Sequence, residues 1–387
     1  MPFDCLDLPW RTAYPALCEW LDSLSLEALQ AYKASPETLA EAVKTWLPEA
    51  QQLVALCETN VNQAERYQTD ICHESEANYD SHLATGIPGR KWAQITAFNR
   101  AISLSHQGSW LEWCAGKGYL GRVLSACRQA KVTSLEWQPA LCQDGQAYAD
   151  QHQLSMHFVN GDAFAPESEA LVSRCDHAVA LHACGDLHVT LLRHGVVAKP
   201  QSLTVSPCCY HLIRDSHYQP LSVLAKQSSL SLSRHDLKLP LQETVTAGQT
   251  VRNKRIVEVS FRLGFDSLQR ALGHSDSYLP VPNVQKSLLS EGFEAFCHWA
   301  ADKKGISIPD NTDFAAYLRQ GETRFLTVEK METLRTLFRR ALEMWLVLDR
   351  AIYMSENGFD VEISTFCARE LTPRNLLIKA TRKAKWN

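Results

Sequence analysis

The sequence lacks the features that would place it in several special classes of protein. Its 387 residues contain no uninterrupted apolar stretch long enough to cross a membrane. There is no internal repeat and no low-complexity tract, and the first residues, MPFDCLDLPW, carry no basic region followed by an apolar run. The 13 cysteines are scattered and do not form a small-domain disulfide framework. We therefore predict a cytoplasmic protein without a membrane partner.

The charge balance shows no excess of either sign. A net charge of −4 gives no global signal for nucleic-acid binding, so a polyanionic partner would need a local basic face. The hydrophobic fraction of 45% and the charged fraction of 21% describe a globular protein with ample material for a core. The length predicts two domains or one domain with large additions.

The chain is organised around the stretch SWLEWCAGKGYLGR, residues 109–122. Its pattern predicts a buried strand, a tight turn and a helix whose free N–H groups face that turn. The full dinucleotide fingerprint with three glycines is absent. The acid Glu112 is followed by the small residues Cys114, Ala115, Gly116 and Gly118. This order resembles motif I of class I S-adenosylmethionine (SAM)-dependent methyltransferases, in which the backbone at the glycines approaches the methionine moiety.

Three successive predicted strands end in acids, which are Glu112, Glu136 and Asp162. The carboxylate of Glu136 suits two ribose hydroxyls, because it can accept both hydrogen bonds. Asp162 can accept a hydrogen bond from the adenine amino group. The positive charges of SAM favour such an acidic rim. We predict a cofactor site formed by Lys91, Glu112, Cys114, Ala115, Gly116, Gly118, Glu136, Trp137, Asp162, Ala163, Phe164 and His182.

The fourth and fifth predicted strands, CDHAVALHACGDL and QSLTVSPCCYHLI, end in groups that can carry out chemistry. Because the carboxyl ends of parallel neighbouring strands share one rim, these side chains should gather beside the transferred methyl group. The predicted catalytic residues are His182, Asp186, Cys208, Cys209, Tyr210 and His211. A histidine or Asp186 can act as a base, and Tyr210 can stack on a flipped base.

The remaining segments define the predicted fold. It is an α/β fold: a Rossmann-like, seven-stranded methyltransferase sheet with a helical N-terminal extension and a large insertion before the last helix and hairpin. Residues 1–85 form the extension and residues 86–387 the methyltransferase domain, with the insertion at about 216–330. The pattern after Val328 predicts a long helix, and the C-terminal segment predicts a closing antiparallel hairpin.

The motifs GRKWAQITAF, WCAGKGYLGR, SLEWQ, LHACGDL, SPCCYH, LPLQETVTAG and LTPRNLLI together resemble one methyltransferase-like family. That family includes the C-terminal part of the glutathione S-transferase C-terminal domain-containing protein and its bacterial relatives. More distantly, GKG with CCYH is similar to tRNA acceptor-stem methyltransferases, although their cysteine/histidine zinc modules are missing here. The resemblance spans roughly residue 86 to the C-terminus. It implies SAM as cofactor and RNA, either tRNA or rRNA, as the favoured substrate.

Several chemistries remain open at this stage. HACG stands where amino-methylating enzymes place Asn or Asp followed by two prolines, which argues against an adenine or cytosine amino acceptor. A thiolate at Cys208 or Cys209 would suit methylation of pyrimidine C5, but the second Pro–Cys of such RNA enzymes is missing. We expect no metal, because adjacent cysteines seldom direct both thiols at one ion and no clean CxxC pair is present.

The substrate and the partner are also predictions. RNA would bind through basic residues, which are Arg252, Lys254, Arg255, Arg339, Arg340, Arg374, Lys379, Arg382, Lys383 and Lys385. The alternatives are a methyltransferase acting on protein or small molecules, a SAM-binding scaffold without catalysis, and an NAD-linked oxidoreductase. The sequence does not define the modified atom or the oligomeric state.

Overall fold

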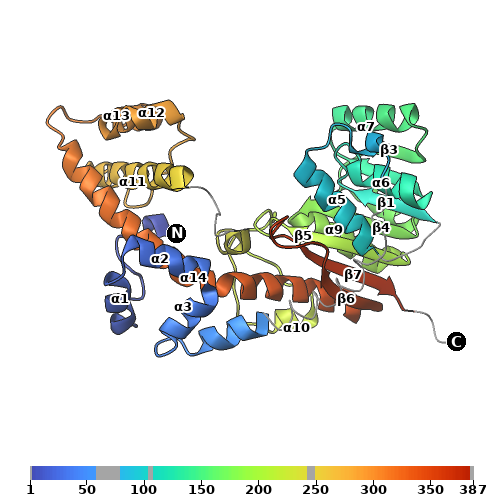
Figure 1. Cartoon of the computed structure of the whole chain (residues 1–387), viewed down its shortest axis with the longest axis horizontal. Coiled ribbons are helices and arrows are strands. Elements are labelled where there is room, and N and C mark those ends of the chain that lie inside the picture. Colours follow the sequence, from blue (N-terminus) through green and yellow to red (C-terminus); the bar gives the residue numbers. More distant parts are fainter. Residues whose placement is uncertain (1, 58–78, 103–107, 242–248, 384–387) are drawn as a thin grey trace. The chain divides into compact units, whose positions relative to one another are not determined.

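The computed structural model describes residues 2–57, 79–102, 108–241 and 249–383 (Figure 1). The chain forms two compact units. The helical unit contains Met1–Val54 and Thr244–Arg340, and the sheet unit contains Ala55–Glu243 and Ala341–Asn387. Each unit is built from segments that are far apart in the sequence. The boundaries predicted from the sequence, at residue 85 and around 216–330, stay predictions.

The sheet unit contains seven strands in the order β3-β2-β1-β4-β5-β7-β6. The strands β3, β2, β1, β4 and β5 are parallel to one another, and β7 is antiparallel to both β5 and β6. The strands are β1 (Ser109–Trp113), β2 (Lys131–Glu136), β3 (Met156–Asn160), β4 (His177–Cys184), β5 (Ser202–Cys208), β6 (Phe359–Thr365) and β7 (Leu376–Arg382). The predicted seven-stranded α/β sheet with its closing hairpin is confirmed.

Helices connect the parallel strands and cover the sheet (Figure 1). They are α5 (Gly89–Ala101), α6 (Tyr119–Arg128), α7 (Pro139–Gln151), α8 (Ser168–Ser173) and α9 (Asp186–Ala198). Apolar residues of α5 and α6 pack with β1 and β2 in one core cluster, while residues of α8 and α9 pack with β4 and β5 in another. Burial of both sheet faces explains the nearly continuous apolar runs of these strands.

Beyond β5 the sheet unit continues through α10 (Val223–Lys226) and the 3-10 helix η3 (Asp236–Leu241). Helix α14 (Phe314–Glu356) then contributes residues up to Arg340 to the helical unit and its remaining residues to the sheet unit. The long helix predicted after Val328 is therefore present, but it begins at Phe314, well before the predicted stretch.

The helical unit contains the 3-10 helix η1 (Pro2–Asp4) and the helices α1 (Pro15–Asp22), α2 (Leu26–Ala34), α3 (Pro36–Val43), α11 (Gln249–Ala271), α12 (Lys286–Ser290) and α13 (Phe293–Lys304), besides the first part of α14. Ser35 caps the start of α3, because its side chain accepts a hydrogen bond from the Thr38 N–H. The helical character predicted for the N-terminal region is confirmed for the residues described here.

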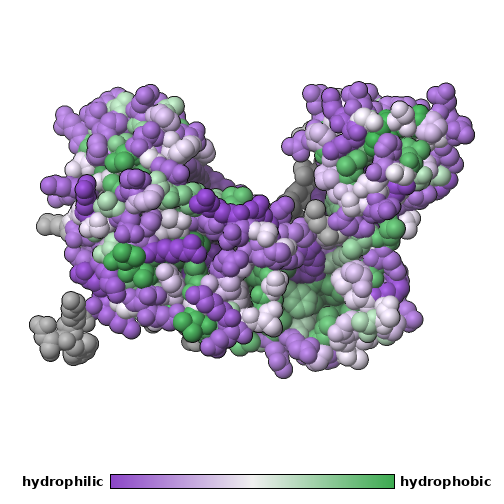
Figure 2. Space-filling view, turned by 180° about the vertical axis from the view of Figure 1, so that it is seen from behind, coloured by the Kyte–Doolittle hydropathy of each residue, from purple (hydrophilic) through white to green (hydrophobic). Residues whose placement is uncertain are grey.

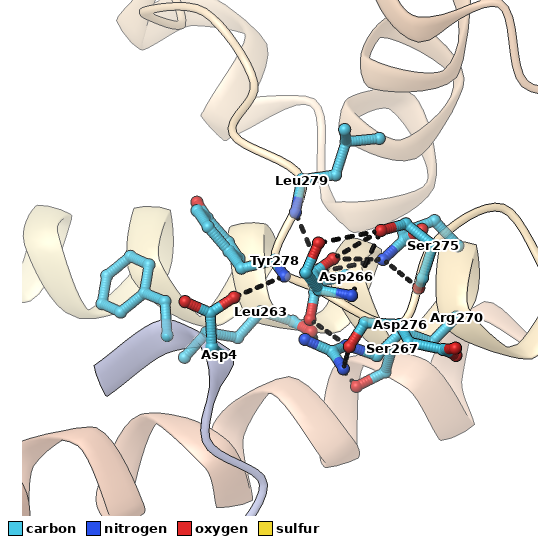
Figure 3. Close-up of polar contacts among 12 residues, drawn as sticks. Asp4, Leu263, Asp266, Ser267, Arg270, Ser275, Asp276, Tyr278 and Leu279 are labelled. Carbon is cyan, nitrogen blue, oxygen red and sulfur yellow. Dashed lines mark hydrogen bonds and ion pairs between the residues drawn. The ribbon is translucent and has the colours of Figure 1, made fainter. Parts of the chain in front are cut away.

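A buried acid ties several segments of the helical unit together (Figure 3). Asp266 is fully buried and forms ion pairs with Arg270 at 2.7 Å and with Arg324 at 2.8 Å. It also accepts the Leu279 N–H at 3.2 Å, and Asp4 accepts the neighbouring Tyr278 N–H at 2.7 Å. These bonds join α11, α14 and the N-terminal segment, so the carboxylate is satisfied by structure and carries no sign of chemistry.

The space-filling view shows a mostly hydrophilic surface with scattered hydrophobic residues (Figure 2). Large exposed apolar side chains come from many different elements, including Leu6, Val197 and Leu348. Among the described residues, no helix combines the length and the apolar character that crossing a membrane requires.

Candidate functional site

The turn between β1 and α6 leaves free space in front of its backbone. Cys114, Gly116 and Gly118 all have positive φ, at 56°, 60° and 68°. A Cβ at Gly116 would meet no atom within 4 Å, whereas a Cβ at Gly118 would lie 2.4 Å from Cζ of Phe158. Gly118 is thus required for close packing against the sheet, and Gly116 faces open space in which a ligand can approach the backbone.

Glu136 lies beside this turn at the end of β2. Its side chain is 8% exposed. Its Oε2 accepts the Gly116 N–H at 2.8 Å and its Oε1 accepts the Gln138 N–H at 2.9 Å. Each carboxylate oxygen can accept a second hydrogen bond, so the group is held rigidly with acceptor capacity to spare.

The end of β3 adds a second acid and an aromatic ring. Asp162 accepts the Phe164 N–H through Oδ1 at 2.9 Å. The rings of Phe164 and Trp137 are 36% and 67% exposed, which is unusual for large apolar side chains. Ala163, which lies between Asp162 and Phe164 in the sequence, is buried. The carboxyl edge of β2 and β3 therefore combines two carboxylates with two exposed aromatic surfaces.

Cys114 lies in the same turn as Gly116, whose N–H Glu136 accepts. Burial raises the pKa of the Cys114 thiol to about 12, and the negative charges of Glu136, Cys184 and Asp162 add to this effect. These groups therefore lie within electrostatic reach of the turn. Ala115 is fixed there by its N–H, which donates to the Leu135 carbonyl at 2.9 Å.

Glu112 does not complete the predicted trio of carboxylates at this edge. It is 4% exposed, accepts the Ser134 hydroxyl at 2.9 Å, and accepts the N–H groups of Gly121 and Leu120. Burial raises its pKa to about 7, although these hydrogen bonds act to lower it. The first turn of α6 offers free N–H groups to the carboxylate, so Glu112 is held under the helix start.

The end of β4 is irregular, and this irregularity positions His182. The pairing with β5 shifts register between Leu181 and Cys184, and His182 has φ of 68°. The His182 side chain is exposed. Partial desolvation, followed by the positive charge of Lys91, lowers its pKa. Lys91 is itself exposed at the start of α5, with Nζ 4.6 Å from the centre of the Tyr119 ring.

Three thiols meet where β4 and β5 end. Cys184 and Cys208 are register partners with sulfurs 3.5 Å apart, and the sulfur of Cys209 lies within 4.8 Å of both. Hydrogen bonds from Cys184 and Cys208 lower the pKa of Cys209, and hydrogen bonds with Cys184 and Cys209 raise that of Cys208. Cys208 is also 3% exposed, which makes it a poor nucleophile.

The other predicted catalytic residues have structural neighbours. Tyr210 is 1% exposed, and the Arg350 guanidinium lies 5.2 Å from its ring centre, so the predicted stacking on a flipped base is not available to it. Asp186 accepts the Arg214 N–H at 2.7 Å and thereby anchors the segment after β5. His211 is half-buried, and its Nδ1 has no hydrogen-bond partner among the described residues.

Sequence reasoning missed a buried polar chain behind the site. His188 is held between the Ala183 carbonyl, 2.8 Å from Nδ1, and Nε of Arg350, 2.8 Å from Nε2. Burial, with the Arg350 charge, lowers the pKa of His188 to about 3, so the neutral ring donates to Ala183 and accepts from Arg350. Arg350 also donates to Tyr218, which donates to Asp349. These hydrogen bonds hold the irregular end of β4 in place through the Ala183 carbonyl. The only signal in the sequence was a charged pair within the apolar run MWLVLDRAIYM.

This sheet order and turn define a class I methyltransferase fold, and comparison with known proteins agrees. Residues 90–216 match the family model of a methyltransferase domain. The matched segment and the sheet order identify a methyltransferase domain within the sheet unit, for which SAM is the expected cofactor. The rim fits this cofactor, because acceptor oxygens, exposed aromatic rings and an open backbone lie together there.

Solved structures of other proteins are similar in part. The chain is 12% identical to the PH0226 protein from Pyrococcus horikoshii OT3, with a TM-score of 0.27 over 31% of this chain and 58% of that one. It is 15% identical to the tRNA (uracil-54, C5)-methyltransferase from Pyrococcus abyssi in complex with S-adenosyl-L-homocysteine, with a TM-score of 0.25 over 30% and 28% of the two chains. It is 12% identical to a putative sarcosine dimethylglycine methyltransferase from Galdieria sulphuraria, with a TM-score of 0.26 over 30% of this chain and 45% of that one.

Proposed function

We propose that the sheet unit transfers a methyl group from SAM to RNA, at a site between β4 and β5. The observation that carries the proposal is the edge formed by Glu136 and Asp162 beside the open backbone of Gly116. The sequence motifs from residue 86 onward support RNA as the substrate through their resemblance to the methyltransferase-like family and, more distantly, to tRNA acceptor-stem enzymes.

The residues of the edge suit each part of the cofactor. Glu136 retains one acceptor position on each oxygen for the two ribose hydroxyls, and the second oxygen of Asp162 can accept from the adenine amino group. The exposed rings of Trp137 and Phe164 supply apolar surface for the adenine. When bound, SAM supplies a methyl carbon whose bond to sulfur breaks as the bond to the acceptor atom forms, with S-adenosyl-L-homocysteine as the other product.

His182 is the best placed of the predicted catalytic residues to contact the acceptor. It is exposed, whereas Cys208 and Tyr210 are buried and Asp186 holds a backbone N–H. A ring nitrogen of His182 would take the proton that a hydroxyl or ring-nitrogen acceptor loses when it becomes methylated.

Exposed cations near the edge support a phosphate-bearing substrate. The Arg214 guanidinium lies 5.2 Å from the ring centre of Phe164, and Lys91 is close enough to lower the pKa of His182. Other predicted contacts are less suitable: Arg339 is buried, Lys379 pairs with Glu362 at 3.2 Å, and Lys383 lies 3.8 Å from Asp360. Lys385 lies outside the described residues.

The test is incubation of the full chain with methyl-labelled SAM and total RNA from a strain that lacks the gene. We expect label in RNA with the wild type and a large loss with His182→Ala. His157→Ala, which changes an exposed histidine on β3, is the matched control and should keep full transfer. Label in protein or small molecules alone would refute the RNA substrate, and SAM binding without any transfer would indicate a scaffold.

A further inference from the structure

The thiols of Cys184, Cys208 and Cys209 form a group that the methyl-transfer reaction does not require. All three sulfurs lie within 4.8 Å of one another, and the pair from Cys184 and Cys208 is 3.5 Å apart. Across the described residues, they form this group without a histidine nitrogen or a carboxylate oxygen.

The backbone explains why adjacent cysteines converge here. In a regular strand, Cys208 and Cys209 would point to opposite faces of the sheet. Cys209 instead has φ of 48° directly after β5, and the register shift near Cys184 brings that residue opposite Cys208. The premise behind the expectation of no metal, that neighbouring thiols point apart, therefore does not apply to this segment.

We propose that Cys184, Cys208 and Cys209 bind one zinc ion as three thiolates. Zinc–sulfur bonds of about 2.3 Å in tetrahedral geometry place two sulfurs about 3.8 Å apart. The observed 3.5 Å pair is close to this spacing, and a third sulfur within 4.8 Å needs only a small movement. A disulfide needs about 2.05 Å, which is much shorter than the observed separation.

The chemistry of the ligands selects the metal. Soft thiolates favour zinc over magnesium or calcium, which prefer oxygen ligands. Three thiolates and a divalent ion carry a net charge of −1. Three protein ligands leave the fourth tetrahedral position open to water or to an acceptor atom.

Metal binding has a consequence for the mechanism. It connects the end of β4 to the segment that follows β5. It also occupies Cys208 and Cys209, so neither is free to attack a pyrimidine ring. The proposal does not depend on the substrate being RNA.

The test is metal analysis of the full chain purified without chelators. We expect about one zinc per chain in the wild type. The control Cys127→Ser, which changes an exposed cysteine of α6, should bind the same amount. Cys184→Ser and Cys208→Ser should contain at least severalfold less zinc. Because these serine variants can fail to fold, the wild type is also loaded with cobalt(II). Thiolate-to-cobalt charge-transfer absorption that added zinc abolishes would support the site. A wild type that takes up neither metal, or that contains a Cys184–Cys208 disulfide, would overturn it.

Discussion

Glu112 offers a sharp test of how the edge of the sheet is built. It is a buried carboxyl group whose pKa is raised to about 7 from its ordinary value of 4.5. The folded protein therefore keeps this proton to a higher pH than the unfolded chain does. The stability that the protonated group contributes is complete below pH 4.5 and is lost as the pH rises toward about 7.

The size of the effect follows from the shift in pKa. Each pKa unit corresponds to about 1.4 kcal/mol, so the whole contribution is about 3 kcal/mol. Glu112→Gln removes the titration and keeps the shape of the side chain. The free energy of unfolding of the wild type, measured relative to the variant, should fall by about 3 kcal/mol between pH 4.5 and pH 7.5.

Urea unfolding of both proteins at a series of pH values measures this difference. His188, whose pKa is lowered to about 3, makes stability rise with pH over part of the same range. That effect is common to both proteins and cancels in the comparison. A difference that stays constant from pH 4.5 to pH 7.5 would show that Glu112 is hydrated or ionised in the fold, and it would refute the buried position described above.

Three further predictions concern the turn, the rim and the polar chain behind it. Gly118→Ala should lower the free energy of unfolding by about 2–4 kcal/mol, because the new Cβ meets Phe158. Gly116→Ala should lower it by only about 1 kcal/mol but should weaken SAM binding in calorimetry. Equal losses of stability in the two variants would contradict this prediction. Glu136→Gln should weaken SAM binding about tenfold and also lower the melting temperature slightly, because the amide NH2 cannot accept one of the two backbone N–H groups that Glu136 binds. Unchanged affinity would argue against a ribose contact. Arg350→Met should lower the free energy of unfolding by about 2–4 kcal/mol in chemical denaturation, because the buried hydrogen-bond partners His188 and Tyr218 are left unpaired. An unchanged free energy of unfolding would mean that the hydrogen bonds behind β4 do not stabilise the fold.

The sheet was predictable because its signals are local. Alternation of apolar strands and helices indicates a parallel sheet, and parallel strands bring residues such as Glu136 and Asp162 to one edge whatever their distance in the sequence. The same reasoning could not foresee that Glu112 is directed under α6, because the choice depends on the free N–H groups of that helix and on the Ser134 hydroxyl.

Other features depend on contacts that leave little trace in a local pattern. The pairing of Met1–Val54 with Thr244–Arg340 in one unit joins segments that are far apart in the chain. Helix α11 was not predicted, although it extends over Gln249–Ala271. The convergence of three thiols depends on a single left-handed residue, Cys209, and on a register shift in β4, and neither has a sequence signature.

Titration of the full chain with SAM in a calorimeter tests the central claim most directly. The claim is that a cofactor lies over Gly116 and is held by the carboxylates of Glu136 and Asp162. We predict one binding site per chain, with affinity about tenfold lower in Asp162→Asn at an unchanged melting temperature, and about tenfold lower in Glu136→Gln. Binding of equal strength in the wild type and both variants, or no binding to the wild type, would contradict the account.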